Sequence, residues 1–270
     1  MSEIAEALKL KEAELEKQLD PIRKKLLAAR DKRVRPLTDT KVLTADNGLM
    51  IGGLADAARI LKNDRYLAAA TKAAEFVLAN LRTKEGRLLR TYSDPAASSG
   101  RAAPAADKPT GKAKLNAYLN DYAFLADGLL RLHQATGDKK WLTAADEITA
   151  KQLELFRDEK TGGFYFTSSD HEALFARGKD PVDGAIPSGN SVAACNLLIL
   201  SKNLNKPDLV PLAQKTIGSS AGLLEQSPTA APRMAIAIPL LLEQMPAEKK
   251  EETKEDEKPQ KRNRAGRTRS

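Results

Sequence analysis

The chain has 270 residues, of which 44 are lysine or arginine and 36 are aspartate or glutamate, giving a formal net charge of +8. Hydrophobic residues make up 41% of the chain, which is enough for a folded core in one large domain or two small ones. The single cysteine, Cys195, excludes an internal disulfide, a CxxC redox centre and a cysteine-based zinc site within this chain.

Neither a membrane-spanning helix nor a secretion signal is predicted. No run of about 18 apolar residues occurs in the sequence. The first residues, MSEIAEALKLKEAELEKQ, carry charges of both signs and have no apolar centre of the kind found in signal peptides. We therefore expect no export and a cytoplasmic location.

Much of the positive charge lies in two segments. Residues 26–36 end in several cations just before Pro36, where positive charge complements a helix C-terminus. Residues 246–270 form a mixed-charge tail that cannot bury enough apolar surface to fold, so we predict that it is disordered. Aromatic residues make up only 4% of the chain and do not alternate with basic ones, which disfavours nucleic-acid binding. Solvated surface charge and weak binding to polyanions both stay open for these segments.

Apolar residues at helical spacing predict one helix after another. Residues 3–30 are interrupted at Asp20 and Pro21, which indicates two helices or one kinked helix. Short connections elsewhere indicate antiparallel helical hairpins. The other predicted helices cover residues 48–61, 65–81, 117–137, 139–156, 190–204, 209–226 and 231–245.

Two stretches break this pattern. Residues 95–112 are small, polar and rich in proline, which predicts a flexible loop at about 93–115 within a single helical domain of residues 1–245. Gly162 and Gly163 precede FYFT, the one convincing strand-like stretch, where we expect a small β-hairpin on the rim of the domain.

Four motifs resemble the helical C-terminal portion of the thioredoxin-domain-containing, spermatogenesis-associated protein family. In the family's order they are KVLTADNGLMI (41–51), LNDYAFLADGLLRLHQATGDKKWL (119–142), GGFYFT (162–167) and DGAIPSGNSVAA (183–194). The resemblance covers about residues 26 to 245. It implies an all-α fold similar to the six-hairpin glycosidases, an (α/α) toroid whose inner helix ends and loops form a central cleft.

The sequence departs from that family in three respects. It has no thioredoxin-like domain and none of that domain's cysteines, so a redox role is unsupported. Only about 25 residues precede residue 26, so we expect an incomplete ring of roughly seven to nine helices instead of twelve. Asp46 stands where the family tends to have an aromatic residue, which weakens the case for sugar stacking there.

Three carboxylates within these motifs are candidate catalytic residues: Asp46, Asp121 and Asp183. Glycoside cleavage needs two carboxyl groups, one protonated as the acid and one ionised as base or nucleophile. Each candidate also has a structural alternative. Asp46 or its neighbour Asn47 could cap a helix, Asp121 could complement a helix dipole, and Asp183 before a glycine could form a turn.

Four further residues are candidate substrate-binding groups. They are Asn47, Tyr122, Ser188 and Asn190. Tyr122 could orient a ligand or only pack, and the residues around Ser188 could hold a sugar hydroxyl or only cap a helix. Two unpatterned histidines, His133 and His171, predict no metal site, and we expect no cofactor.

The sequence therefore favours a toroid-like domain that binds or processes a carbohydrate. If the domain is an enzyme, a glycosidase-like hydrolase or a related carbohydrate-active enzyme is expected. The alternative is a non-catalytic interaction domain that has lost its thioredoxin partner and binds a protein, or a second copy of itself, through exposed helix faces.

Overall fold

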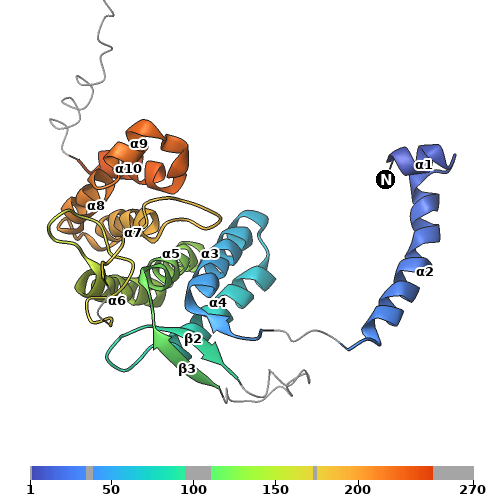
Figure 1. Ribbon diagram of the computed structural model, residues 1–270, viewed down its shortest axis with the longest axis horizontal. Coiled ribbons are helices and arrows are strands. Elements are labelled where there is room, and N and C mark those ends of the chain that lie inside the picture. The colour runs from blue at the N-terminus through green and yellow to red at the C-terminus, as the bar shows by residue number, and fades with distance from the viewer. Residues whose placement is uncertain (1, 35–38, 95–110, 173–174, 246–270) are drawn as a thin grey trace, which may run out of the picture. The chain divides into compact units, whose positions relative to one another are not determined.

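The computed structural model describes residues 2–34, 39–94, 111–172 and 175–245 (Figure 1). They separate into two compact units. The first contains residues 2–34 and 39–40, and the second contains the other described residues. The predicted tail at 246–270 and most of the predicted loop at 93–115 lie outside the described residues.

The first unit consists of α1 (Ser2–Ala7) and α2 (Glu12–Asp31). The interruption between them lies at residues 8–11, where Lys9 has a left-handed φ of 56° that an α-helix cannot contain. Of the two alternatives predicted at Asp20 and Pro21, separate helices are wrong, because α2 continues through Pro21. A proline inside a helix removes one backbone hydrogen bond, and here the helix accommodates that loss.

The second unit is a series of helical hairpins followed by a last helix. Its helices are α3 (Thr44–Leu61), α4 (Asp64–Asn80), α5 (Leu119–Thr136), α6 (Lys139–Phe156), α7 (Gly189–Leu204), α8 (Leu209–Gly218), α9 (Ala221–Gln226) and α10 (Pro232–Gln244), with a 3-10 turn at Pro228–Ala230. The single helix predicted for residues 209–226 is divided at Ser219, whose hydroxyl donates to the carbonyl of Thr216 at 2.7 Å.

These helices form two layers. Helices α3, α5, α7 and α10 contact one another in that order and form the inner layer, while α4, α6 and α8 pack on their hairpin partners as the outer layer. Figure 1 shows this succession from blue α3 and α4 through green α5 to orange α7, α8 and α10. Within the described residues the inner layer is thus an arc of four helices.

A small antiparallel sheet accompanies the helices, with strand order β1-β2-β3. Its strands are β1 (Val42–Leu43), β2 (Leu89–Ser93) and β3 (Lys112–Asn116). The small hairpin expected at FYFT is reduced to one isolated antiparallel bridge, and the three-stranded sheet is formed by other segments. Gly162 and Gly163 have φ values of 78° and 70° and turn the chain so that Phe164 forms only one isolated bridge, with Arg157.

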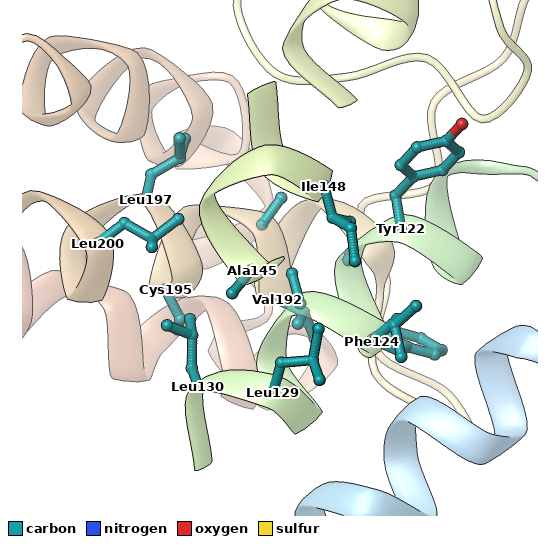
Figure 2. Close-up of a cluster of buried hydrophobic side chains, with 14 of the residues drawn as sticks. Tyr122, Phe124, Leu129, Leu130, Ala145, Ile148, Val192, Cys195, Leu197 and Leu200 are labelled. Carbon is teal, nitrogen blue, oxygen red and sulfur yellow. The ribbon is translucent and has the colours of Figure 1, made fainter. Parts of the chain in front are cut away.

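The core of the second unit lies between the layers. Figure 2 shows Leu129 and Leu130 of α5, Ala145 and Ile148 of α6 and Val192 of α7 gathered in one cluster. All of these side chains are buried. Because burying each large aliphatic side chain contributes about 1.5–3 kcal/mol, this cluster supplies much of the free energy that holds α5, α6 and α7 together.

Helices α3 and α5 approach each other at two glycines. A Cβ added to Gly48 would lie 2.5 Å from the backbone nitrogen of Leu125, and one added to Gly128 would lie 2.4 Å from the carbonyl oxygen of Gly48. Real Cβ atoms do not come so close to backbone atoms. The two helices can therefore pack at this distance only because both positions lack a side chain.

We expect Gly128→Ala to lower the free energy of unfolding by about 1–3 kcal/mol, because the new methyl group forces the two helices apart. The matched control is Gly53→Ala in α3, where an added Cβ meets nothing within 4 Å. That change should raise stability by roughly 0.5–1 kcal/mol, since alanine favours helix over glycine. Urea unfolding of both variants measures the difference, and equal effects would contradict this packing.

Candidate functional site

Asp121 joins the N-terminal ends of two inner helices. Its Oδ2 accepts from the backbone N–H of Tyr118 at 2.8 Å, at the start of α5, and its Oδ1 accepts from the N–H of Ala45 at 2.9 Å, in the first turn of α3. The predicted place of Asp121 in a first helical turn is confirmed. Its contact with a second helix could not be predicted from local sequence.

The carboxyl group of Asp121 is buried, with 2% of the residue exposed. Burial raises its pKa from 3.8 to about 6, against the lowering effects of the two backbone hydrogen bonds and of the positive charge on Arg90. The negative charge of Asp46 raises it further. A carboxyl group with this pKa can hold a proton near neutral pH.

Asp46 and Asp121 line one pocket of about 120 Å³ at this end of the inner layer. Asp46 lies exposed in the first turn of α3, whereas Asp121 forms the buried wall. The pocket brings together two of the three predicted catalytic residues, one accessible and one shielded. Its lining residues are Leu43, Ala45, Asp46, Arg90, Asn120, Asp121, Phe166 and Ile186.

Six residues of this pocket were not predicted as site residues, and three of them, Arg90, Asn120 and Phe166, carry polar or aromatic side chains. The guanidinium of Arg90, on β2, lies 4.8 Å from the ring centroid of Tyr118. The Tyr118 ring stacks on Phe166 with centroids 5.0 Å apart and planes inclined by 11°. Asn120 precedes Asp121 within a motif and could have been chosen from the sequence. Phe166 also lies in a motif, GGFYFT, whereas Arg90 lies in none of the four, and only folding brings it to this pocket.

Asp183 repeats the arrangement of Asp121 on the other two inner helices. Its Oδ1 accepts from the N–H of Ser188 at 2.7 Å, at the start of α7, and its Oδ2 accepts from the N–H of Arg233 at 2.7 Å, at the start of α10. Between these two pairs, a Cβ on Gly189 would lie 2.4 Å from Asn120 Oδ1, so α5 and α7 also begin side by side. All four inner helices therefore start at the same end of the layer. Asp183 does not line the pocket of Asp46 and Asp121.

The predicted substrate-binding residues near helix starts are engaged within the protein. Ser188 caps α7, and its Oγ accepts from the N–H of Asn190 at 3.1 Å. Asn190 accepts from the N–H of Phe164 at 2.7 Å and donates to its carbonyl at 2.9 Å, on the edge of FYFT opposite its bridge with Arg157. Asn47 donates to the carbonyl of Leu43 at 2.8 Å. Because α3 begins at Thr44, neither Asp46 nor Asn47 is its N-cap.

Tyr122 lies in the core, fully buried, away from the pocket. Its hydroxyl accepts from the N–H of Leu88 at 2.9 Å, and its ring packs on Phe156 with centroids 5.1 Å apart. Figure 2 shows this hydroxyl pointing away from the aliphatic cluster. Burial raises the pKa of Tyr122. The geometry corresponds to the packing alternative and gives Tyr122 no access to a ligand.

Across the described ranges, no helix is both long and apolar enough to cross a membrane. The same part of the chain contains no group of three or more histidine, cysteine, aspartate or glutamate side chains placed to hold a metal ion.

Sequence comparison identifies relatives of this chain. Human spermatogenesis-associated protein 20 is 34% identical over 217 residues, which is 79% of this chain and 26% of the human protein. This chain is a relative of spermatogenesis-associated protein 20. The mouse protein is 34% identical over 212 residues, and an uncharacterized protein of Caenorhabditis elegans is 30% identical over 226 residues. The resemblance inferred from the four motifs is confirmed, although no family model matches the sequence. The chain spans about a quarter of the length of spermatogenesis-associated protein 20.

Solved structures show the same fold. The family 76 glycoside hydrolase α-mannanase of Bacteroides thetaiotaomicron has a TM-score of 0.51 and 17% identity, covering 68% of this chain and 45% of its own. The unsaturated glucuronyl hydrolase of Bacillus sp. GL1 has a TM-score of 0.51 and 15% identity, covering 70% and 49%. The expected helical fold, similar to the six-hairpin glycosidases, is confirmed, and it is a carbohydrate-related fold in these neighbours.

The pKa of Asp121 makes stability depend on pH in a defined direction. Because its pKa of about 6 in the folded protein lies above its ordinary value of 3.8, the folded state binds more protons between these limits. The protonated Asp121 carboxyl group therefore contributes to the free energy of unfolding. This contribution is complete well below the ordinary pKa of 3.8 and is lost as the pH rises through 6. In Asp121→Asn this titration is absent.

We expect the free energy of unfolding of Asp121→Asn, relative to the unmodified chain, to rise by about 2 kcal/mol between pH 4 and pH 7. Urea unfolding at several pH values measures this difference, in which the other titrating groups cancel. A difference that stays constant or falls over this range would show that burial does not raise the pKa of Asp121.

Proposed function

We propose that this chain binds a carbohydrate at the pocket of Asp46 and Asp121 and processes it there. The observation that carries the proposal is the pairing of a buried carboxyl group of raised pKa with an exposed carboxylate in one pocket. Glycosidic cleavage uses one protonated and one ionised carboxyl group, which are the roles proposed for Asp121 and Asp46 respectively.

The other lining residues suit a sugar. Phe166 and Ile186 offer apolar surface to the ring, while Asn120 and Arg90 offer hydrogen-bond donors to its hydroxyl groups. The volume of about 120 Å³ is below the usual range for small-molecule sites, so the pocket admits part of one sugar unit. The α-mannanase and the unsaturated glucuronyl hydrolase that share the fold support a carbohydrate ligand by analogy of fold alone. A cytoplasmic location stays a prediction.

The first test is a melting assay of the chain against mono- and oligosaccharides. A sugar at about a hundred times its dissociation constant adds roughly 2.7 kcal/mol to stability, which raises the melting temperature measurably. A cooperative transition that no sugar shifts would contradict the proposal and favour the interaction-domain alternative.

Asp46→Asn tests the catalytic role, because it removes the exposed carboxylate without breaking a hydrogen bond described for it. We expect turnover of the identified sugar to fall by at least about a hundredfold, with little change in melting temperature. Asp64→Asn is the matched control, since Asp64 is an exposed aspartate in the first turn of α4. It should leave turnover unchanged, and equal activity in the two variants would remove Asp46 from the mechanism.

A further inference from the structure

A second and larger pocket, of about 450 Å³, lies along the shared face of the four inner helices. Its charged residues are Asp56 and Arg59 of α3, Asp127 and Arg131 of α5, and Arg233 of α10. Asp56 in α3 and Arg131 in α5 each lie twelve residues, about 18 Å along the helix axis, beyond the first residue of their helix. This pocket is therefore far from the helix starts. The pocket shares no lining residue with the pocket of Asp46 and Asp121.

The five charged side chains form one alternating network. Asp127 accepts from Arg233 Nη2 at 2.7 Å through Oδ1 and from Arg131 Nε at 2.8 Å through Oδ2. Asp56 accepts from Arg131 Nη1 through Oδ2, and its Oδ1 lies 3.7 Å from Arg59 Nη2. Each of the four carboxylate oxygens is thus engaged by an arginine nitrogen.

The arginines retain unused donors. Three guanidinium groups carry about fifteen N–H bonds, nearly four times as many as the two aspartates engage. The Nε–H of Arg233 is buried and has no acceptor among the described residues. Such a donor is costly unless a partner is supplied. Because three arginines face two aspartates, the network also carries one net positive charge.

The walls of the pocket define the rest of a ligand. Leu130, Ile199, Ile236 and Leu240 are apolar, and Gln134 and Asn203 add amide groups at its exposed parts. The volume falls within the range of 300–1,000 Å³ typical of small-molecule sites. The pocket therefore suits a molecule with a negatively charged group and a carbon skeleton.

We propose that this pocket is a binding site for the oxyanion group, phosphate or carboxylate, of a small metabolite. Arg59, Arg131 and Arg233 donate to the oxyanion, since planar guanidinium groups match both kinds of oxygen pair. Asp127 holds the guanidinium groups of Arg131 and Arg233 in place, whereas Asp56 competes with the ligand for donors of Arg131. The site does not depend on the proposed carbohydrate chemistry, because it uses other residues and another ligand class.

Binding is tested by melting shifts and calorimetry with inorganic phosphate, glucose 6-phosphate, glucuronate and neutral glucose. We expect glucose 6-phosphate, glucuronate or both to bind, and glucose not to bind at this pocket. Binding of the phosphate ester alone or of the carboxylate alone would identify which oxyanion the site prefers. No binding by any of the three anions, or an equal effect of glucose and glucose 6-phosphate, would overturn the proposal.

Variants that remove a positive charge and a variant that removes a negative charge test whether the anion binds in this pocket. Arg59→Gln and Arg233→Gln should each weaken anion binding by about tenfold or more, because each removes charge-assisted donors. Asp56→Asn should strengthen it severalfold, since it frees donors of Arg131 and adds one positive charge. Arg65→Gln removes the same charge from the exposed surface of α4 and should leave binding unchanged.

These variants keep the proposal falsifiable even if Arg233→Gln does not fold. Arg59 is 47% exposed and its nearest carboxylate is 3.7 Å away, so its replacement should preserve the fold. If Arg59→Gln and Arg65→Gln weaken binding equally, the anion is attracted by overall surface charge and the pocket is not the site. If Asp56→Asn weakens binding as much as Arg59→Gln does, the network is purely structural.

Discussion

Two buried or half-buried carboxylates hold the starts of the inner helices together. Asp121 accepts from α3 and α5, and Asp183 accepts from α7 and α10, in each case with one oxygen for each helix. The first backbone N–H groups of a helix have no partner within it, and the helix dipole favours an anion there. One side chain thus accepts hydrogen bonds from the first backbone N–H groups of two helices and fixes the position of one helix start relative to the other. The end of the layer where the candidate site lies depends on these two contacts.

This arrangement places two demands on Asp121. As a bridge between helices it accepts two backbone hydrogen bonds, which are stronger when the carboxyl group is ionised, but the cost of burying the charge outweighs that gain and makes the protonated form the more stabilising one. As a general acid it must hold a proton, and burial moves its pKa in that direction. A carboxyl group at a helix start can therefore bridge two helices and hold a proton at once where the effect of burial on its pKa exceeds that of its hydrogen bonds.

Much of the fold could be predicted because helical periodicity is a local property. The helix predicted at residues 139–156 has the bounds of α6, and the predicted starts of α7 and α10 differ by one residue from those observed. The predictions failed where contacts between residues far apart in the sequence determine the local structure. FYFT has the composition of a strand, but it forms only one bridge, with Arg157, and on its other edge the Asn190 side chain takes the backbone hydrogen bonds of Phe164. In the same way Asp46 and Asp121 were predictable as candidates, while the presence of Arg90 beside them depends on tertiary packing.

The glycines at the crossing of α3 and α5 also bear on the curvature of the whole layer. Helices that carry side chains at their contact pack about 8–10 Å apart, and a contact between bare backbones is closer. When neighbours in the inner layer stand closer than their partners in the outer layer, successive hairpins must splay outward and the array bends. The absence of side chains at Gly48 and Gly128 thereby favours curvature of the layer at the contact of α3 with α5.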